Sequence, residues 1–454
     1  MAEIRYTCKR TAVSTKPVQP GKRLPLSVLD RLMEPKHLRV VYYYGSDDPA
    51  REAGERTRTL RETLARTLTS FPKATGRLQR DGEGRWEIDC NDAGVRVMEA
   101  RARGSVEDWL RNAGREDELR LVHWEEMFDT PYFWSTFYVQ MTEFEGGGFA
   151  IGLSCIHLLA DPTCATMFIK AWADMTLNAR LTAPPPSFRA LPKRRPSHRN
   201  DPDRHNSLIN HCKSSINTSS LTPSAKFGTL SLAFTEPIVR SCIAMARPVD
   251  APDGPGPSPF EALAGLFWAC ISKVKGEREG LVSMCLGLDV RKLLGLEREF
   301  FGNCMVYNNS LHARDNEEDN SLPGAAKAIG EMMAKLDKDG VMDLIEWLEI
   351  NDDTRPKNTR SLNFSELLFL NLEGIEPDTA RFEDTHAPIR VSCYFEPTCK
   401  EGQVVILPST PEDGSMSRVV MVTLPEDELV KLMEHDLVMS LRPIILMGLN
   451  KNRA

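Results

Sequence analysis

The amino-acid sequence predicts a mixed α/β protein built from two helix-and-strand halves. Three observations support this prediction. Helical spacing of apolar residues and strand-like apolar runs follow one another up to about residue 182. A stretch rich in proline and basic residues then interrupts the pattern, and a second series of helices and strands follows it. We therefore expect an N-terminal domain over 1–182, a crossover linker over 183–226 and a C-terminal domain over 227–454.

The first half begins with a predicted helix over about 55–70. Its leucines recur every four residues, which is the spacing of one helix face, and the pattern stops at Pro72. The elements expected after it are, in order, a hairpin with the turn Asp81-Gly-Glu-Gly84, a strand over Val95–Ala100, a short helix capped by Ser105, and paired strands over Phe137–Phe144 and Phe149–Ile156.

The second half begins with a predicted helix over 258–273. Ser258 suits the N-cap and Pro259 the first helical position, because proline lacks an amide hydrogen that this position does not need. The elements expected near the end of the chain are strands over Val404–Leu407 and Arg418–Leu424 and a helix that opens at Pro425.

Composition and charge narrow the class of function. The 57 Lys and Arg residues against 64 Asp and Glu give a net charge of −7, so we expect no nucleic-acid partner. Eleven cysteines, without paired spacing, indicate reduced thiols and a cytoplasmic protein. The charged N-terminal residues indicate no secretory signal. The apolar stretch Leu437–Leu449 is broken by Arg442-Pro443 and is shorter than the ~20 residues of a membrane span.

A metal site is one alternative that the sequence raises. His198, His205, His211 and Cys212 fall close together in the predicted linker. Their spacing is irregular and their surroundings are polar, so solvated side chains are the favoured interpretation. We predict no metal site.

The segment Ser154-Cys-Ile-His-Leu-Leu-Ala-Asp-Pro-Thr163 is the sharpest chemical feature of the chain. Asp161 before Pro162 predicts a helix start, since its carboxylate can accept from the free amides of the first turn. His157 then lies on a strand-to-helix turn, where an imidazole can take a proton from a hydroxyl or amine near neutral pH. The alternative is structural: Asp161 only caps the helix and His157 is an ordinary turn residue.

Other stretches accompany this HxxxD segment in a fixed order. They are Thr75-Gly-Arg-Leu78, Phe260-Glu-Ala-Leu-Ala-Gly-Leu-Phe-Trp268, Leu288-Asp-Val-Arg-Lys292, Phe301-Gly-Asn303 and Leu424-Pro-Glu-Asp-Glu428. With them, nearly the whole chain resembles the BAHD superfamily of plant acyl-CoA-dependent acyltransferases.

The resemblance implies a two-domain fold like that of chloramphenicol acetyltransferase, with a channel between the halves. It implies that His157 deprotonates an alcohol or amine acceptor, which then attacks an acyl-CoA co-substrate. Asp161 would orient the turn, and Asn303 would line the channel. No cofactor is implied, and the favoured oligomeric state is a monomer.

One family motif is missing. The resemblance places DFGWG where this chain has Phe382-Glu-Asp-Thr-His386, and none of the five residues matches. In the family, the aspartate of that motif pairs with the arginine that corresponds to Arg291. Because an unpaired buried charge costs several kcal/mol, we expect Glu383 or Asp384 to replace it.

This loss, with Cys90-Asn-Asp-Ala-Gly-Val-Arg-Val-Met-Glu99 and Leu370-Asn-Leu-Glu-Gly374, is most similar to the eceriferum branch of the superfamily. That branch acts in cuticular wax formation on very-long-chain acyl groups, at the endoplasmic reticulum. Two hypotheses follow. The chain is an acyltransferase for long or very-long acyl groups, or it is a non-catalytic partner of a fatty acid elongase condensing enzyme.

Overall fold

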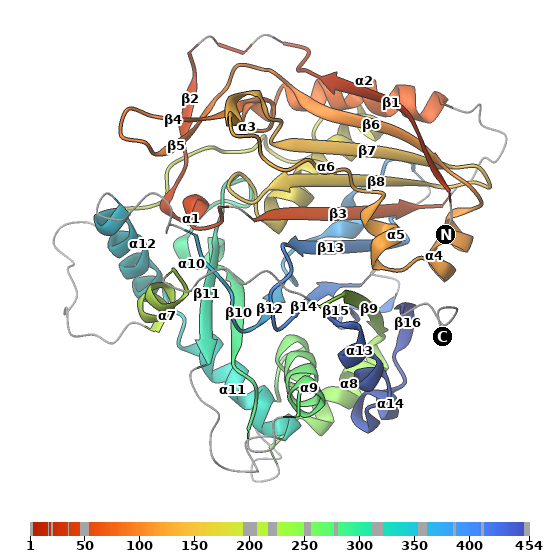
Figure 1. Ribbon diagram of the computed structural model, residues 1–454, viewed down its shortest axis with the longest axis vertical. Coiled ribbons are helices and arrows are strands. Elements are labelled where there is room, and N and C mark those ends of the chain that lie inside the picture. The colour runs from red at the N-terminus through yellow and green to blue at the C-terminus, as the bar shows by residue number, and fades with distance from the viewer. Residues whose placement is uncertain are drawn as a thin grey trace. The chain divides into compact units, whose positions relative to one another are not determined.

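The computed structural model describes most of the chain. The described residues are 3–16, 18–19, 21–34, 36–45, 54–193, 207–216, 225–248, 256–276, 280–310, 321–352, 361–384, 387–409 and 413–448. The chain forms two compact units (Figure 1). The first unit comprises Met1–Leu191, Leu296–Cys304 and Ile375–Pro397, and the second comprises Pro192–Gly295, Met305–Gly374 and Thr398–Ala454.

The two units differ from the consecutive domains 1–182 and 227–454 that the sequence suggests. Two segments from the C-terminal half belong to the first unit, and the reason is strand pairing. β13 (Arg390–Glu396) pairs antiparallel with β3 (His37–Tyr44), with Arg390 opposite Tyr43. Local periodicity cannot reveal a pairing between strands so distant in the sequence.

The main sheet of the first unit has six strands, and the helices α2 and α6 contact each other beside it (Figure 1). In spatial order its strands are β1 (Ile4–Ala12), β6 (Val95–Ala102), β7 (Phe137–Phe144), β8 (Phe149–Ile156), β3 and β13. The bounds predicted for β7 and β8 are confirmed. The pairing of β6 with β7 is parallel, and the remaining neighbours are antiparallel.

Trp172 links the two long helices of the first unit, because its buried Nε1–H donates to the Leu60 carbonyl at 3.0 Å. The leucines that predicted the first helix, Leu60, Leu64 and Leu68, are all buried. The helices of this unit are α1 (Val28–Arg31), α2 (Glu55–Leu68), α3 (Pro72–Thr75), α4 (Val106–Asn112), α5 (Arg115–Leu119) and α6 (Pro162–Asn178), with 3₁₀ turns η1 (Pro131–Phe133) and η4 (Pro377–Thr379).

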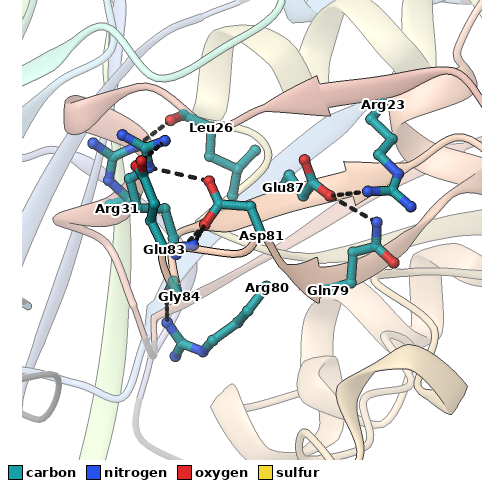
Figure 2. A network of polar contacts seen from close by, with 10 residues as sticks. Arg23, Leu26, Arg31, Gln79, Arg80, Asp81, Glu83, Gly84 and Glu87 are labelled. Carbon is teal, nitrogen blue, oxygen red and sulfur yellow. Dashed lines mark hydrogen bonds and ion pairs between the residues drawn. The ribbon is translucent and has the colours of Figure 1, made fainter.

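A small three-stranded sheet confirms the predicted hairpin. Its order is β2 (Arg23–Pro25), β5 (Trp86–Asp89) and β4 (Arg77–Arg80). At the turn, the amides of Glu83 and Arg85 donate to Asp81 Oδ1 at 2.9 and 2.8 Å (Figure 2). These bonds, of which the Arg85 amide contributes most, lower the pKa of Asp81.

The second unit is built on a seven-stranded sheet. Its order is β11 (Met305–Ser310), β10 (Met284–Asp289), β12 (Leu367–Asn371), β14 (Gln403–Pro408), β15 (Arg418–Pro425), β9 (Phe227–Phe234) and β16 (Ile444–Met447). Its helices are α7 (Ser207–Ile216), α8 (Glu236–Met245), α9 (Pro259–Val274), α10 (Arg291–Leu294), α11 (Leu322–Ala334), α12 (Lys338–Asp352), α13 (Glu426–Met433) and α14 (Asp436–Leu441).

The central helix of the second unit, α9, is capped as the sequence predicts. Ser258 Oγ accepts from the Glu261 amide at 3.3 Å, and Glu261 Oε2 accepts from the Ser258 amide at 2.7 Å. Its apolar residues Phe260, Leu263 and Phe267 are fully buried. This helix therefore anchors the core of the second unit.

The stretch expected as a linker, 183–226, holds the helix α7. His211 and Cys212 were expected to be solvated, and this is wrong: both are buried. They share one face of α7, and His211 Nε2 contacts the Cys285 sulfur at 3.3 Å. His198 and His205 lie outside the described residues.

Two features of the described residues bear on membranes and metals. Every helix there falls short of the length and apolar character that a bilayer crossing requires. Within the same residues, no three His, Cys, Asp or Glu side chains are grouped to hold a metal ion. All eleven cysteines are described and none forms a disulfide.

Candidate functional site

His157 follows directly after β8 and precedes α6 in the first unit. Its backbone amide donates to the Lys36 carbonyl at 2.8 Å, which attaches the turn to the start of β3. The His157 side chain is completely buried. The strand-to-helix turn predicted from the sequence is therefore present, and it carries the imidazole inward.

The imidazole of His157 has an unusual environment. In the part of the chain that the structure describes, neither Nδ1 nor Nε2 has a hydrogen-bond partner. The ring packs against Phe395, with the centroids 5.4 Å apart. Burial lowers the pKa of His157 from 6.5 to about 4, and the nearby Asp161 carboxylate offsets only part of that effect. At neutral pH the ring is thus uncharged and one nitrogen can accept a proton.

Asp161 is held by two backbone amides from different segments. Its Oδ1 accepts from the Cys164 amide at 3.0 Å, which makes it the N-cap of α6. Its Oδ2 accepts from the Cys304 amide at 2.9 Å. Pro162 occupies the first helical position, as predicted. Asp161 therefore joins the start of α6 to the segment Leu296–Cys304.

Asn303 reaches the same turn from that segment. Its side chain is completely buried, and Nδ2 donates to the His157 carbonyl at 2.6 Å and to Asp30 Oδ1 at 2.8 Å. The sequence suggested that Asn303 lines a channel, with a simple turn as the alternative. The contacts support a positioning role at His157, and the channel stays a prediction.

Asp30 is a member of this site that the sequence analysis missed. Its Oδ1 also accepts from the Asn303 amide at 2.9 Å, while Oδ2 accepts from the Ser27 amide at 2.8 Å and lies 3.7 Å from Lys73 Nζ. The available signal was Ser27-Val-Leu-Asp30, a capping box at the start of α1. Such a pattern predicts a helix start but not a second, distant partner.

Arg291 lies on α10 in the second unit, away from any unpaired state. Its Nη1 donates to Asp289 Oδ2 at 2.6 Å. Glu383, expected as the substitute partner, binds Arg56 at 3.0 Å within the first unit. Asp289 thus supplies a carboxylate for the buried guanidinium two residues before it. Thr385 and His386, which end the altered motif, lie outside the described residues.

Comparison with known proteins agrees with this geometry. The sequence profile of the Transferase family matches residues 2–438. Among similar proteins are ECERIFERUM 26-like from Arabidopsis thaliana, 28% identical over 93% of this chain and 92% of that protein, and rosmarinate synthase from Plectranthus scutellarioides, 28% identical over 89% and 93%.

The fold has solved relatives. The crystal structure of vinorine synthase superimposes with a TM-score of 0.72 over 98% of this chain and 100% of that chain, at 16% identity. This likeness confirms the predicted α/β acyltransferase fold. On the family profile and these relatives, the chain belongs to the Transferase family of BAHD, or HxxxD-type, acyl-CoA-dependent acyltransferases.

Proposed function

We propose that the protein transfers long or very-long acyl groups from acyl-CoA to an alcohol or amine, with His157 as the general base. The single observation that carries the proposal is the buried, uncharged imidazole whose two nitrogens are unpaired among the described residues. A buried polar group without a partner is costly, so a fold that keeps one at a family motif has a chemical use for it.

The reaction can be written with this ring as proton carrier. The acceptor hydroxyl or amine gives its proton to a ring nitrogen while its oxygen or nitrogen bonds to the thioester carbonyl carbon. The carbon–sulfur bond then breaks, and the leaving CoA thiolate takes the proton back from the imidazolium. The products are the ester or amide and free CoA, and no covalent acyl-enzyme forms.

The other side chains of the site have positioning roles in this scheme. Asp161 is occupied by two amides, so it fixes the turn and its negative charge favours the imidazolium that forms during transfer. Asn303 holds the carbonyl of His157 itself. Both residues act through His157, so they are not proposed to touch the substrate.

The acyl chain length is proposed from the relatives. ECERIFERUM 26-like supports the wax-forming branch, for which the sequence resemblance implies very-long acyl groups. Rosmarinate synthase is equally identical, at 28%, and hydroxycinnamoyltransferases also match, so aromatic acyl donors are the competing substrate class.

A second candidate function is favoured by the altered motif Phe382-Glu-Asp-Thr-His386. In this alternative the protein is a non-catalytic partner of a fatty acid elongase condensing enzyme and sets the acyl chain length at the endoplasmic reticulum. The buried imidazole would then be a remnant of the ancestral chemistry.

One experiment separates the candidates. Wild type, His157→Ala and the control His123→Ala are each co-expressed with an elongase condensing enzyme, and the acyl chain-length profile is measured. The purified proteins are also assayed for CoA release with saturated acyl-CoAs of increasing length and with hydroxycinnamoyl-CoA. His123 is a suitable control because it is a partly buried histidine of the same unit that pairs with Glu125.

Transfer supports the first proposal only if His157→Ala abolishes it in a folded protein and His123→Ala retains it. A lengthened acyl profile that survives His157→Ala would overturn the catalytic role and support the partner role. Activity with hydroxycinnamoyl-CoA alone would refute the long-chain assignment and keep His157 as base.

A further inference from the structure

A pocket of about 220 Å³ lies in the first unit at the N-terminal end of α2, beside the strands β1, β6 and β7. Three arginines line it: Arg58 and Arg61 from α2 and Arg101 from β6. Two carboxylates, Glu99 and Glu143, also line it. The pocket is remote in sequence from the HxxxD segment, and the proposed acyl transfer makes no use of it.

The two carboxylates of the pocket are already engaged. Glu143 accepts from the amides of Gly54 and Thr57 at 3.1 and 3.2 Å, and from Thr57 Oγ1 at 2.6 Å. It therefore occupies the free amides at the start of α2, where Gly54 has a φ of 87°. Glu99 accepts from Arg10 Nε and Arg61 Nη1, each at 3.1 Å.

Two of the arginines have no such partner. In the described part of the chain, the guanidinium groups of Arg58 and Arg101 make neither an ion pair nor a side-chain hydrogen bond. Arg5 on the edge strand β1 lies directly opposite Arg101 in the antiparallel register, and both are exposed. Like charges in this position repel each other, so the local charge favours an anion.

We propose that Arg58 and Arg101 bind a phosphate group in this pocket. Guanidinium donors match phosphate oxygens in geometry and charge, whereas Glu99 and Glu143 are satisfied internally and do not compete for them. A volume of about 220 Å³ is below the range typical of sites for drug-sized ligands, so the pocket suits a single phosphate rather than a nucleotide. The phosphate belongs to a lipid headgroup or to a free phosphate monoester.

The test uses the full chain and two matched double variants. Arg58→Gln/Arg101→Gln removes the pocket charges. Arg66→Gln/Arg103→Gln removes two exposed arginines from the same helix and the end of the same strand, and neither lines the pocket. Binding is measured by sedimentation with phosphatidylcholine vesicles that contain phosphatidic acid, and by calorimetry with inorganic phosphate. Pure phosphatidylcholine vesicles give the baseline.

The expected result is that the pocket variant binds at least about tenfold more weakly than wild type, while the control variant stays within about twofold. Vesicle binding without binding of inorganic phosphate identifies a headgroup as the source, and the reverse identifies a free phosphate. Equal weakening in both variants would show general electrostatics and overturn the proposal. So would an absence of binding by wild type to both probes.

Folding does not confound this test. Loss of Arg101 removes its repulsion with Arg5, so the pocket variant should unfold at the same temperature as wild type or higher in the absence of anion. Added phosphate should raise the unfolding temperature of wild type and leave that of the pocket variant unchanged. Because this readout is independent of acyl transfer, its failure is distinguishable from failure of the proposed function.

Discussion

Two buried polar groups of the first unit are treated in opposite ways. Glu118 on α5 is completely buried, and its carboxylate accepts from four side chains of two neighbouring strands. They are Tyr43 at 2.9 Å, Ser392 at 3.2 Å, Arg390 and Tyr394. His157 is equally buried, yet among the described residues neither of its ring nitrogens has a partner.

The difference separates a structural polar group from a functional one. Glu118 joins α5 to β3 and β13, so its bonds hold together segments from both ends of the sequence. The polar contacts around His157 hold its backbone and leave the ring unengaged. An unsatisfied buried group costs about 1–3 kcal/mol, and this cost is acceptable where the group is needed for chemistry.

The largest effect on stability is expected at Glu118. Glu118→Ala leaves the Arg390 guanidinium buried without its carboxylate, so the free energy of unfolding should fall by about 3–5 kcal/mol. Urea unfolding at neutral pH measures it. The exposed Glu107→Ala on α4 is the control and should change stability by less than about 0.5 kcal/mol. A loss below about 1 kcal/mol at Glu118 would remove the structural half of the comparison.

The next largest effect is a dependence on pH that comes from His157. Its pKa is about 4 in the folded protein and 6.5 as a reference, so between these values the unfolded chain binds more protons. The stabilisation is complete above pH 6.5 and is lost as the pH falls toward 4, by about 2 kcal/mol between pH 7 and pH 5.

This pH effect is measured as the difference between wild type and His157→Leu in urea unfolding at the two pH values. His37, whose pKa burial lowers to about 3, titrates in both proteins and cancels. An equal pH dependence of the two proteins would contradict the buried, uncharged state of His157.

A smaller effect is expected at Asp161, which is buried but whose carboxylate serves backbone amides. Asp161→Ala removes the N-cap of α6 and should cost about 1–2 kcal/mol, because the Cys164 and Cys304 amides lose their acceptor. Acyl transfer should fall together with stability, since the turn that carries His157 loosens.

The matched control for Asp161 is Ser105→Ala at the N-cap of α4, where Ser105 Oγ accepts from the Asp108 amide at 3.1 Å. It should lose a similar amount of stability from urea unfolding and keep full transfer activity. If both variants retain activity equally, Asp161 is only a cap, which is the alternative that the sequence left open.

Most of the local structure around the site was predictable from the sequence. The strand β8, the N-cap Asp161 and the first-turn Pro162 all depend on neighbouring residues, and each was predicted at its observed position. The long-range partners were not predictable in the same way. Asp30 meets Asn303 across 273 positions, and β13 returns to pair with β3, so neither leaves a periodic signal. Asn303 and Arg291 were identified only through family resemblance.

The smallest effect on stability is expected where the effect on function is largest. His157→Leu replaces an imidazole that has no hydrogen-bond partner among the described residues with an apolar side chain of similar size, beside the apolar ring of Phe395. The free energy of unfolding at pH 7 should therefore change by less than about 1 kcal/mol in either direction. Transfer should fall by about 10²- to 10⁴-fold if the ring is the general base. Glu118→Leu, assayed beside it, should show the opposite pattern, with a large loss of stability and normal turnover by the fraction that remains folded. A loss above about 2 kcal/mol in His157→Leu would mean that the ring has structural bonds after all, and the contrast with Glu118 would no longer identify the functional group.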